Sequence, residues 1–231
     1  MSVNVKNTEN ICSITITTSE VFDIDLTSLC PDKIRQKLKG DFLNQVQSRW
    51  FQQHYNLLAY LSTKFNNTTL IEVGTFRGLG ALALSYNKTN KVISYDIQNL
   101  REINTANNIE FRIKNIYDDA ELILDCPFIF FDAGTYEFDD PDAGKFEKEF
   151  YNFLITNKYK GIVLYDDIYL SKEISNFWKS IKQPKHDLSK VGHMYSRGVE
   201  QNSKRKFFTK CGSGLIDFSG NVNIVDDCQQ P

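Results

Sequence analysis

Short apolar runs and longer helical patterns alternate along most of the chain. Five apolar runs are rich in β-branched or aromatic residues, as buried strands are, and lie at 69–74, 91–97, 109–115, 127–133 and 161–168. Between them, helical spacing of apolar residues occurs at 78–87, 117–124 and 142–158, with a looser connection at 99–107. This alternation predicts an α/β fold in which helices cover both faces of a parallel sheet.

The segments that flank these five runs have their own patterns. An alternating run at 11–18, "ICSITITT", suits a short edge strand. From Pro31 to Phe65, apolar residues recur every three or four positions, which predicts one amphipathic helix or two.

The end of the chain adds further elements. The pattern predicts a helix over 171–182, a sixth strand over 186–192 ("HDLSKVG") and a late strand over 213–220 ("SGLIDFSG"). The stretch 195–210 is polar, basic and aperiodic, so we expect an exposed loop there.

Length and charge narrow the class of protein. A chain of 231 residues suits one globular unit, with an amino-terminal segment and helical cap over 1–66 and the main domain over 67–231. The 27 basic and 29 acidic side chains nearly cancel, which favours a small or neutral substrate over nucleic acid or a membrane surface. The five cysteines share no metal-ligand spacing, and no signal peptide or membrane-spanning run is evident, so we expect a cytoplasmic protein.

The stretch "LIEVGTFRGLGALAL" combines a strand, an acid and a glycine-rich turn. In open α/β sheets, ligands bind beyond the carboxyl ends of the strands, and Gly74 stands at such an end. Glycine lets the backbone approach a ligand closely, whereas the carboxylate of Glu72 repels phosphate and favours an ammonium group. Asp96 ends the second run 24 positions later, where an acid accepts both hydroxyls of a ribose. Together they point to an adenosine that carries an amino acid.

At these residues the sequence resembles the class I S-adenosylmethionine-dependent methyltransferases, whose first motif, acid-x-Gly-x-x-x-Gly, is met by Glu72, Gly74 and Gly78. The resemblance covers about residues 70 to 170 and implies a doubly wound, mostly parallel seven-stranded Rossmann-like sheet with an antiparallel last strand at 213–220. It implies cofactor contacts at Glu72, Gly74, Thr75, Phe76, Gly78, Asp96, Ile97, Asn115 and Ile116. Arg77 either grips the carboxylate of the cofactor or lies on the helix surface.

Three more acids stand at strand ends on the same expected edge: Asp132, Asp166 and Asp167. Three converging carboxylates repel one another unless a cation is present, and oxygen ligands suit Mg²⁺, Mn²⁺ or Ca²⁺. Alternatively, Asp132 borders the cofactor and Asp167 caps the next helix. The layout also resembles metal-dependent small-molecule and sugar O-methyltransferases, in the group of macrocin O-methyltransferase and the cephalosporin hydroxylase-like proteins.

One departure from that group concerns the base. The group often has Asp-Gly-Asp-His after strand four, where this chain has Asp132, Ala133, Gly134 and Thr135. We therefore name Asp132, Asp166 and His193 as catalytic candidates, with His193 as a base or a surface residue. His54 falls in the amino-terminal helix, where Trp50, Phe51 and Tyr55 are expected to pack on the sheet, and His186 opens the predicted sixth strand.

The resulting hypothesis is methyl transfer from S-adenosylmethionine to an oxygen of a small acceptor, with a sugar hydroxyl favoured over a phenol and a divalent ion as helper. An RNA methyltransferase with "NSKRKFFTK" (202–210) as its contact strip is one alternative. A nucleotide-binding oxidoreductase is another, although the spacing G-x-x-x-G-x-G differs from its G-x-G-x-x-G fingerprint. A non-enzymatic partner subunit is a third. The sequence leaves open whether the chain acts as a homo-oligomer.

Overall fold

The computed structural model describes residues 13–29, 52–101, 107–134, 142–192, 194–199 and 206–227. Its centre is a seven-stranded sheet with the order β4-β3-β2-β5-β6-β10-β7. The strands span Thr69–Val73 (β2), Lys91–Asp96 (β3), Ile109–Ile113 (β4), Phe128–Phe131 (β5), Ile162–Tyr165 (β6), Lys185–Asp187 (β7) and Gly214–Asp217 (β10). The five apolar runs of the sequence are therefore the strands β2 to β6, as predicted.

The sheet is parallel except at one strand. The pairs formed among β4, β3, β2, β5 and β6 are all parallel. Strand β10 inserts between β6 and β7 and runs antiparallel to both, with Leu215 opposite Leu164 on one side and His186 on the other. This confirms the expected antiparallel last strand.

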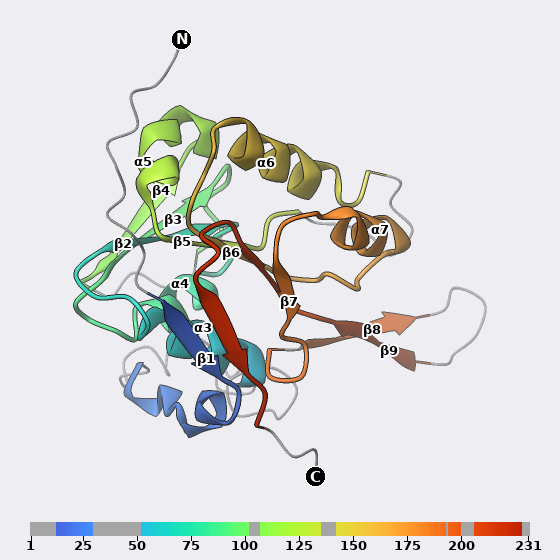
Figure 1. Cartoon of the computed structure of the whole chain (residues 1–231), viewed down its shortest axis with the longest axis horizontal. Coiled ribbons are helices and arrows are strands. Elements are labelled where there is room, and N and C mark those ends of the chain that lie inside the picture. The colour runs from blue at the N-terminus through green and yellow to red at the C-terminus, as the bar shows by residue number, and fades with distance from the viewer. Residues whose placement is uncertain are drawn as a thin grey trace.

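Two helical layers enclose the sheet, as Figure 1 shows. One face carries α3 (Gln52–Ser62) and α4 (Leu79–Leu84), and the other carries α5 (Ala120–Asp125), α6 (Lys145–Thr156) and α7 (Lys172–Ser180). Strand side chains alternate between the two cores, so Leu70 packs with α3 and α4 while Ile71 packs with α5, α6 and α7. No described helix has the length and apolarity that crossing a membrane requires.

The amino-terminal strand belongs to a separate small sheet. Strand β1 (Ile14–Thr17) forms within the alternating run at 11–18, but it pairs in parallel with β11 (Val222–Val225) instead of joining the main sheet. Two short 3₁₀ helices follow it, η1 (Ser19–Asp23) and η2 (Leu26–Leu29), and a third, η3 (Ile116–Asp119), precedes α5. The expected helix from Pro31 is described only from Gln52 onward, as α3.

The expectation of a loop is wrong for 195–199 and 206–210, and the rest of that stretch, 200–205, lies outside the described residues. Strands β8 (Met194–Val199) and β9 (Lys206–Cys211) form an antiparallel hairpin that projects from the body (Figure 1). Backbone pairing between two segments forms such a ribbon, and the polar, aperiodic sequence of 195–210 did not indicate that pairing. The predicted sixth strand at 186–192 is also shorter than expected, because β7 ends at Asp187 and the chain then turns.

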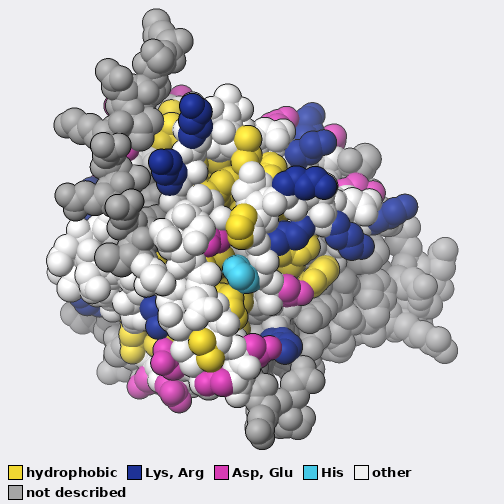
Figure 2. Space-filling view, viewed as in Figure 1, with side chains coloured by type: hydrophobic (Ala, Val, Ile, Leu, Met, Phe, Trp, Pro, Cys, Tyr) yellow, Lys and Arg dark blue, Asp and Glu magenta, His cyan; other side chains and the backbone are white. Residues whose placement is uncertain are grey.

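Charged side chains of both signs share the visible face of the molecule. Figure 2 shows basic side chains on the side of α6 and α7 and acidic ones below, near β1, with apolar and neutral groups between them. On this face, the basic side chains of the described residues gather on the side of α6 and α7.

Candidate functional site

Four neighbouring strands end at one edge of the sheet and bring the predicted site residues together. Strand β3 ends at Asp96, and Gly74, Asp132 and Asp166 directly follow β2, β5 and β6. The chain continues in register past these ends, since the Asp132 N–H donates to the Val73 carbonyl at 2.9 Å and the Asp166 N–H donates to the Phe131 carbonyl at 3.0 Å. The glycine turn and the acids therefore form one row along this edge.

Gly74 makes the first turn possible. Its φ is +97°, and a Cβ at this position would lie 1.8 Å from the carbonyl oxygen of Asp132. The N–H groups of Gly74 and Thr75 both donate to the carbonyl of Tyr95, at 2.8 and 3.1 Å. Only glycine fits between these neighbours, so the turn packs directly against the acidic loop after β5.

Glu72 is buried beneath α4, with 1% of its surface exposed. Its carboxylate accepts hydrogen bonds from the Ser94 hydroxyl and the Ala81 N–H, and burial raises its pKa well above the ordinary value. Gly80 leaves the space for it, because a Cβ there would lie 2.1 Å from Glu72 Oε1. The acid thus ties β2 to α4, and its contact with a cofactor ammonium group stays a prediction.

Asp96 is oriented by the backbone of two neighbouring segments. Its Oδ2 accepts from the Phe76 N–H and its Oδ1 from the Gln98 N–H, both at 2.9 Å. Phe76 adopts a φ of +42° to make this contact. The exposed side chains of Phe76 and Ile97 stand beside the carboxylate, which leaves a polar anchor with apolar neighbours.

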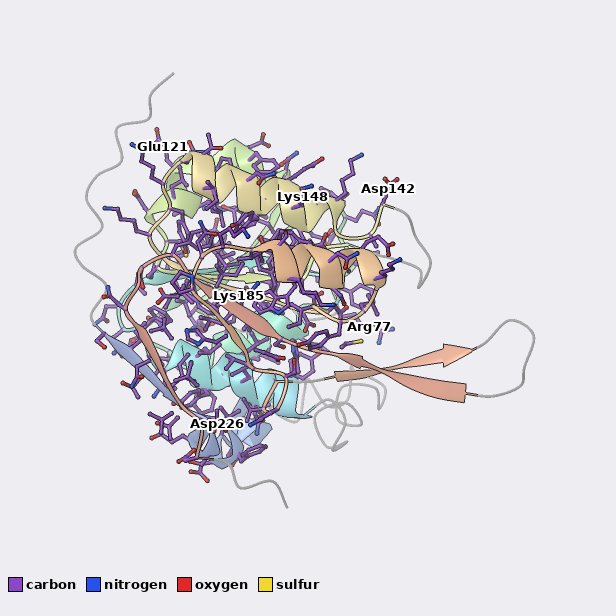
Figure 3. All side chains as sticks on the ribbon, turned by 45° about the vertical axis from the view of Figure 1, so that its right-hand side comes forward. Arg77, Glu121, Asp142, Lys148, Lys185 and Asp226 are labelled. Carbon is purple, nitrogen blue, oxygen red and sulfur yellow. The ribbon has the colours of Figure 1, made fainter. Side chains whose placement is uncertain are left out.

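The remaining predicted cofactor residues have defined local roles. The Asn115 side chain accepts from the Tyr117 N–H at 3.0 Å and so caps η3, while Ile116 is buried in the core between the sheet and α5. Gly78 starts α4 with a φ of +88°. The guanidinium of Arg77 lies 5.4 Å from the centre of the Phe76 ring, and Figure 3 places it below α7.

Asp132, Asp166 and Asp167 converge on one point. Each offers a carboxylate oxygen, and these three atoms all lie within 4.8 Å of one another. Asp166 is buried, Asp167 is half-buried and Asp132 is exposed. Asp167 has a φ of +56°, a conformation that aspartate tolerates and that turns the chain so that two consecutive acids serve the same point.

We call Asp132, Asp166 and Asp167 the acid triad. Protein groups satisfy only part of the hydrogen-bonding capacity of its carboxylates. Ser213 donates a hydrogen bond to Asp166 Oδ1 at 3.3 Å, whereas Asp166 Oδ2 and Asp167 Oδ1 are buried without a hydrogen-bond partner in the described structure. A buried carboxylate oxygen without a partner is costly. Such atoms suit ligation of a cation.

The pKa values of the triad reflect this crowding. Burial raises the pKa of Asp166 to about 7, although the Asp167 N–H and the Ser213 hydroxyl oppose the shift. Burial and then the charge of Asp166 raise the pKa of Asp167 to about 8. Asp132 keeps contact with solvent, yet the protein around it and then the two neighbouring carboxylates raise its pKa well above the ordinary value.

His54 is the residue at this site that the sequence analysis missed. It lies on α3 with 2% of its surface exposed, and its Nδ1 stands 3.6 Å from Asp166 Oδ1. Burial lowers its pKa to about 4, against the attraction of Asp132, so the imidazole is neutral. The available signal was a histidine at helical spacing from Leu57, Leu58 and Leu61, on a helix that also buries Asn56 and Ser62.

The other expected base and its surroundings are only partly described. His193 lies outside the described residues, as do Thr135, Trp50 and Phe51. Tyr55 is half-buried and packs against the core that α3 shares with the sheet, as predicted. His186 lies on β7, opposite Leu215, away from the triad's strand ends.

Comparison with known proteins rests on structure alone. No family model matches the sequence, and a search of curated proteins found no match. Among solved structures, cofactor-bound Rv0187 from MTB is 12% identical with a TM-score of 0.51, over 87% of this chain and 95% of that chain. The human methyltransferase 10 domain containing protein is 9% identical with a TM-score of 0.50, over 82% of this chain and 98% of that chain.

An O-methyltransferase from Bacillus cereus in complex with SAH is 12% identical with a TM-score of 0.47, over 87% of this chain and 96% of that chain. The first two likenesses, together with the strand order and the antiparallel β10, establish the fold class. It is the seven-stranded Rossmann-like fold of the class I methyltransferases.

Proposed function

We propose that the chain is an S-adenosylmethionine-dependent methyltransferase that acts on an oxygen of a small acceptor in the cytosol, with a sugar hydroxyl favoured over a phenol. The observation that carries this proposal is the row of groups at one sheet edge. There the Gly74 turn packs against Asp132, and the Phe76 N–H in the same loop holds Asp96. A cofactor site and an acidic acceptor site would thus share a wall.

The cofactor part of the proposal rests on Asp96 and the loop from Gly74 to Gly78. The Asp96 carboxylate accepts two backbone N–H groups and retains lone pairs for the hydroxyls of a ribose. Phe76 and Ile97 would supply apolar contact beside it, and Asn115 and Ile116 would border the adenine. Glu72 and Arg77 are the proposed partners of the amino-acid end, through its ammonium and carboxylate groups.

The acceptor part rests on the acid triad. Its oxygen-only donor set and its two unpartnered buried oxygens fit Mg²⁺, Mn²⁺ or Ca²⁺. A divalent ion held there would lower the pKa of an acceptor hydroxyl and fix its position. Asp132, the exposed member, would face the acceptor, and His193 stays the first candidate for the base that removes the proton.

The structure of the sheet disfavours the oxidoreductase alternative. The dinucleotide-binding sheet with strand order 3-2-1-4-5-6 has no antiparallel strand inserted near its edge, whereas β10 runs antiparallel between β6 and β7. The RNA methyltransferase alternative depends on the strip 202–210, of which only Lys206 to Lys210 is described, as part of β9.

Calorimetry with S-adenosylmethionine tests the cofactor assignment. We expect Asp96→Ala to weaken binding by about 1.5 to 3 kcal/mol, the range for a hydrogen bond to a charged group. The matched control is Asp125→Ala, an exposed acid at the end of α5 that should leave affinity unchanged. Equal affinity in Asp96→Ala and wild type, or tighter binding of NAD, would remove the assignment.

Chelation tests the metal. If an ion bound to the triad holds the acceptor, EDTA should abolish methyl transfer while leaving S-adenosylmethionine affinity nearly intact, and Mg²⁺ or Mn²⁺ should restore the rate. Transfer that continues undiminished in EDTA would exclude a catalytic ion.

A further inference from the structure

The buried histidine on α3 is oriented toward the acid triad. His54 Nδ1 has no hydrogen-bond partner in the described part of the chain. Asp166 Oδ1 lies 3.6 Å from it, which is longer than a hydrogen bond. Two aromatic rings also lie close to the imidazole: the centroids of Tyr55 and Phe130 are 5.1 and 5.5 Å away. A ring nitrogen in such a setting needs a polar partner, and the triad is beside it.

The separation of the two atoms distinguishes two kinds of partner. A hydrogen bond from an imidazole N–H to a carboxylate spans about 2.7 to 2.9 Å, so 3.6 Å is too long for one. Two atoms that ligate one ion, each about 2.0 to 2.2 Å from it, lie about 3 to 3.6 Å apart when they are neighbours in its coordination shell. The observed distance therefore suits two ligands of one ion.

The atoms without partners agree with this geometry. His54 Nδ1, Asp166 Oδ2 and Asp167 Oδ1 are all buried and unsatisfied in the described structure. They come from α3 and from the turn after β6, and His54 Nδ1 lies 3.6 Å from Asp166 Oδ1. The three acids lie within 4.8 Å of one another and His54 is outside that group, so a single ion would provide all of these atoms with a partner if the imidazole moved toward Asp132 and Asp167 when the ion binds.

We infer that His54 is a fourth protein ligand, through Nδ1, of the ion that the triad binds. The inference rests on the metal part of the proposed function and extends it to the identity of the ion. Imidazole is a borderline ligand that suits Mn²⁺, Fe²⁺, Co²⁺ or Zn²⁺, whereas Mg²⁺ prefers oxygen. A centre of three carboxylates and one imidazole should therefore select Mn²⁺ or Co²⁺ over Mg²⁺.

The experiment uses the metal alone with the full chain. Calorimetry gives the Mn²⁺ and Mg²⁺ affinities of wild type, His54→Leu and His54→Asn, and pulsed electron paramagnetic resonance of bound Mn²⁺ reports nitrogen coupling. We expect wild type to bind Mn²⁺ at least about tenfold more tightly than Mg²⁺ and to show imidazole coupling. His54→Leu should lose the coupling and about tenfold or more in Mn²⁺ affinity. His54→Asn, which places an oxygen near the former Nδ1, should lose the coupling and shift the preference toward Mg²⁺.

His186→Asn is the matched control, because His186 is half-buried on β7 and should leave metal binding unchanged. Circular dichroism and S-adenosylmethionine affinity verify that each variant is folded. Wild type that binds Mn²⁺ without nitrogen coupling, or a His54→Leu variant that loses Mn²⁺ and Mg²⁺ affinity equally, would overturn the assignment of His54. If Asp166→Asn also leaves metal binding unchanged, or wild type binds no ion, the metal part of the proposed function fails as well.

Discussion

Replacing Asp166 by asparagine should stabilise the metal-free protein, and the gain should depend on pH. Burial raises the pKa of Asp166 from 3.8 to about 7, so the folded state holds this proton more tightly than the unfolded state does. The stability contribution of this group is therefore most favourable below about pH 4, falls as the pH rises to about 7, and is level above that. An asparagine side chain does not titrate, so the variant should lack this loss.

The magnitude follows from the shift in pKa. About 3 units correspond to about 4 kcal/mol at pH 8 as an upper bound. The three carboxylates repel one another and release their protons as a set, so one substitution removes only part of the unfavourable free energy. We therefore expect Asp166→Asn to raise the free energy of unfolding by about 2 to 4 kcal/mol. For a chain of this size, that raises Tm by roughly 4 to 16 °C.

Urea unfolding in EDTA at pH 5 and pH 8 measures this effect. Most of the gain of Asp166→Asn over wild type should appear between these two pH values, and Asp125→Asn should show none of it. Added Mn²⁺ should reverse the order, because it stabilises a folded state that retains all three acids. An equal difference between variant and wild type at both pH values would refute the reasoning.

Three further substitutions test the packing behind the site. Gly74→Ala should cost about 3 kcal/mol or more in urea unfolding, because its Cβ would lie 1.8 Å from the Asp132 carbonyl oxygen; a smaller loss would mean that the turn can move. Gly80→Ala should cost about 1 to 3 kcal/mol, although alanine favours helix, since its Cβ would displace Glu72; a gain of about 1 kcal/mol would show that Glu72 relocates freely. Lys185→Met should cost about 1 kcal/mol in the same assay, because the ammonium donates hydrogen bonds to three carbonyls at the end of α7. Unchanged stability would mean that water satisfies these carbonyls equally well in the variant.

The sequence predicted the parts of the fold that have a strong period. Strands β2 to β6 are buried on both faces and appear as apolar runs, and the order of acids at their ends followed from the parallel architecture. The convergence of Asp132, Asp166 and Asp167 was therefore predictable before any coordinates. The hairpin of β8 and β9 was not, because its pairing is a property of two segments together and the sequence of 195–210 has no regular apolar period.

His54 illustrates a different limit. Its spacing with Leu57, Leu58 and Leu61 identifies a buried helix face, but the direction of that face relative to the acids depends on how α3 crosses the sheet. That crossing is set by packing between residues far apart in the chain. A polar residue on an apolar helix face thus indicates that it has a polar partner, but the sequence does not identify which residue that partner is.

The small sheet of β1 and β11 joins segments from opposite ends of the described chain. Ile14 pairs with Val222, and the Ser19 N–H donates to Asp227, a residue 208 positions away. During synthesis, β1 would leave the ribosome long before its partner exists, so it must wait unpaired while the central sheet assembles. An unfinished chain would then expose the apolar side chains of Ile14 and Ile16, which gives chaperones or proteases a means to recognise it.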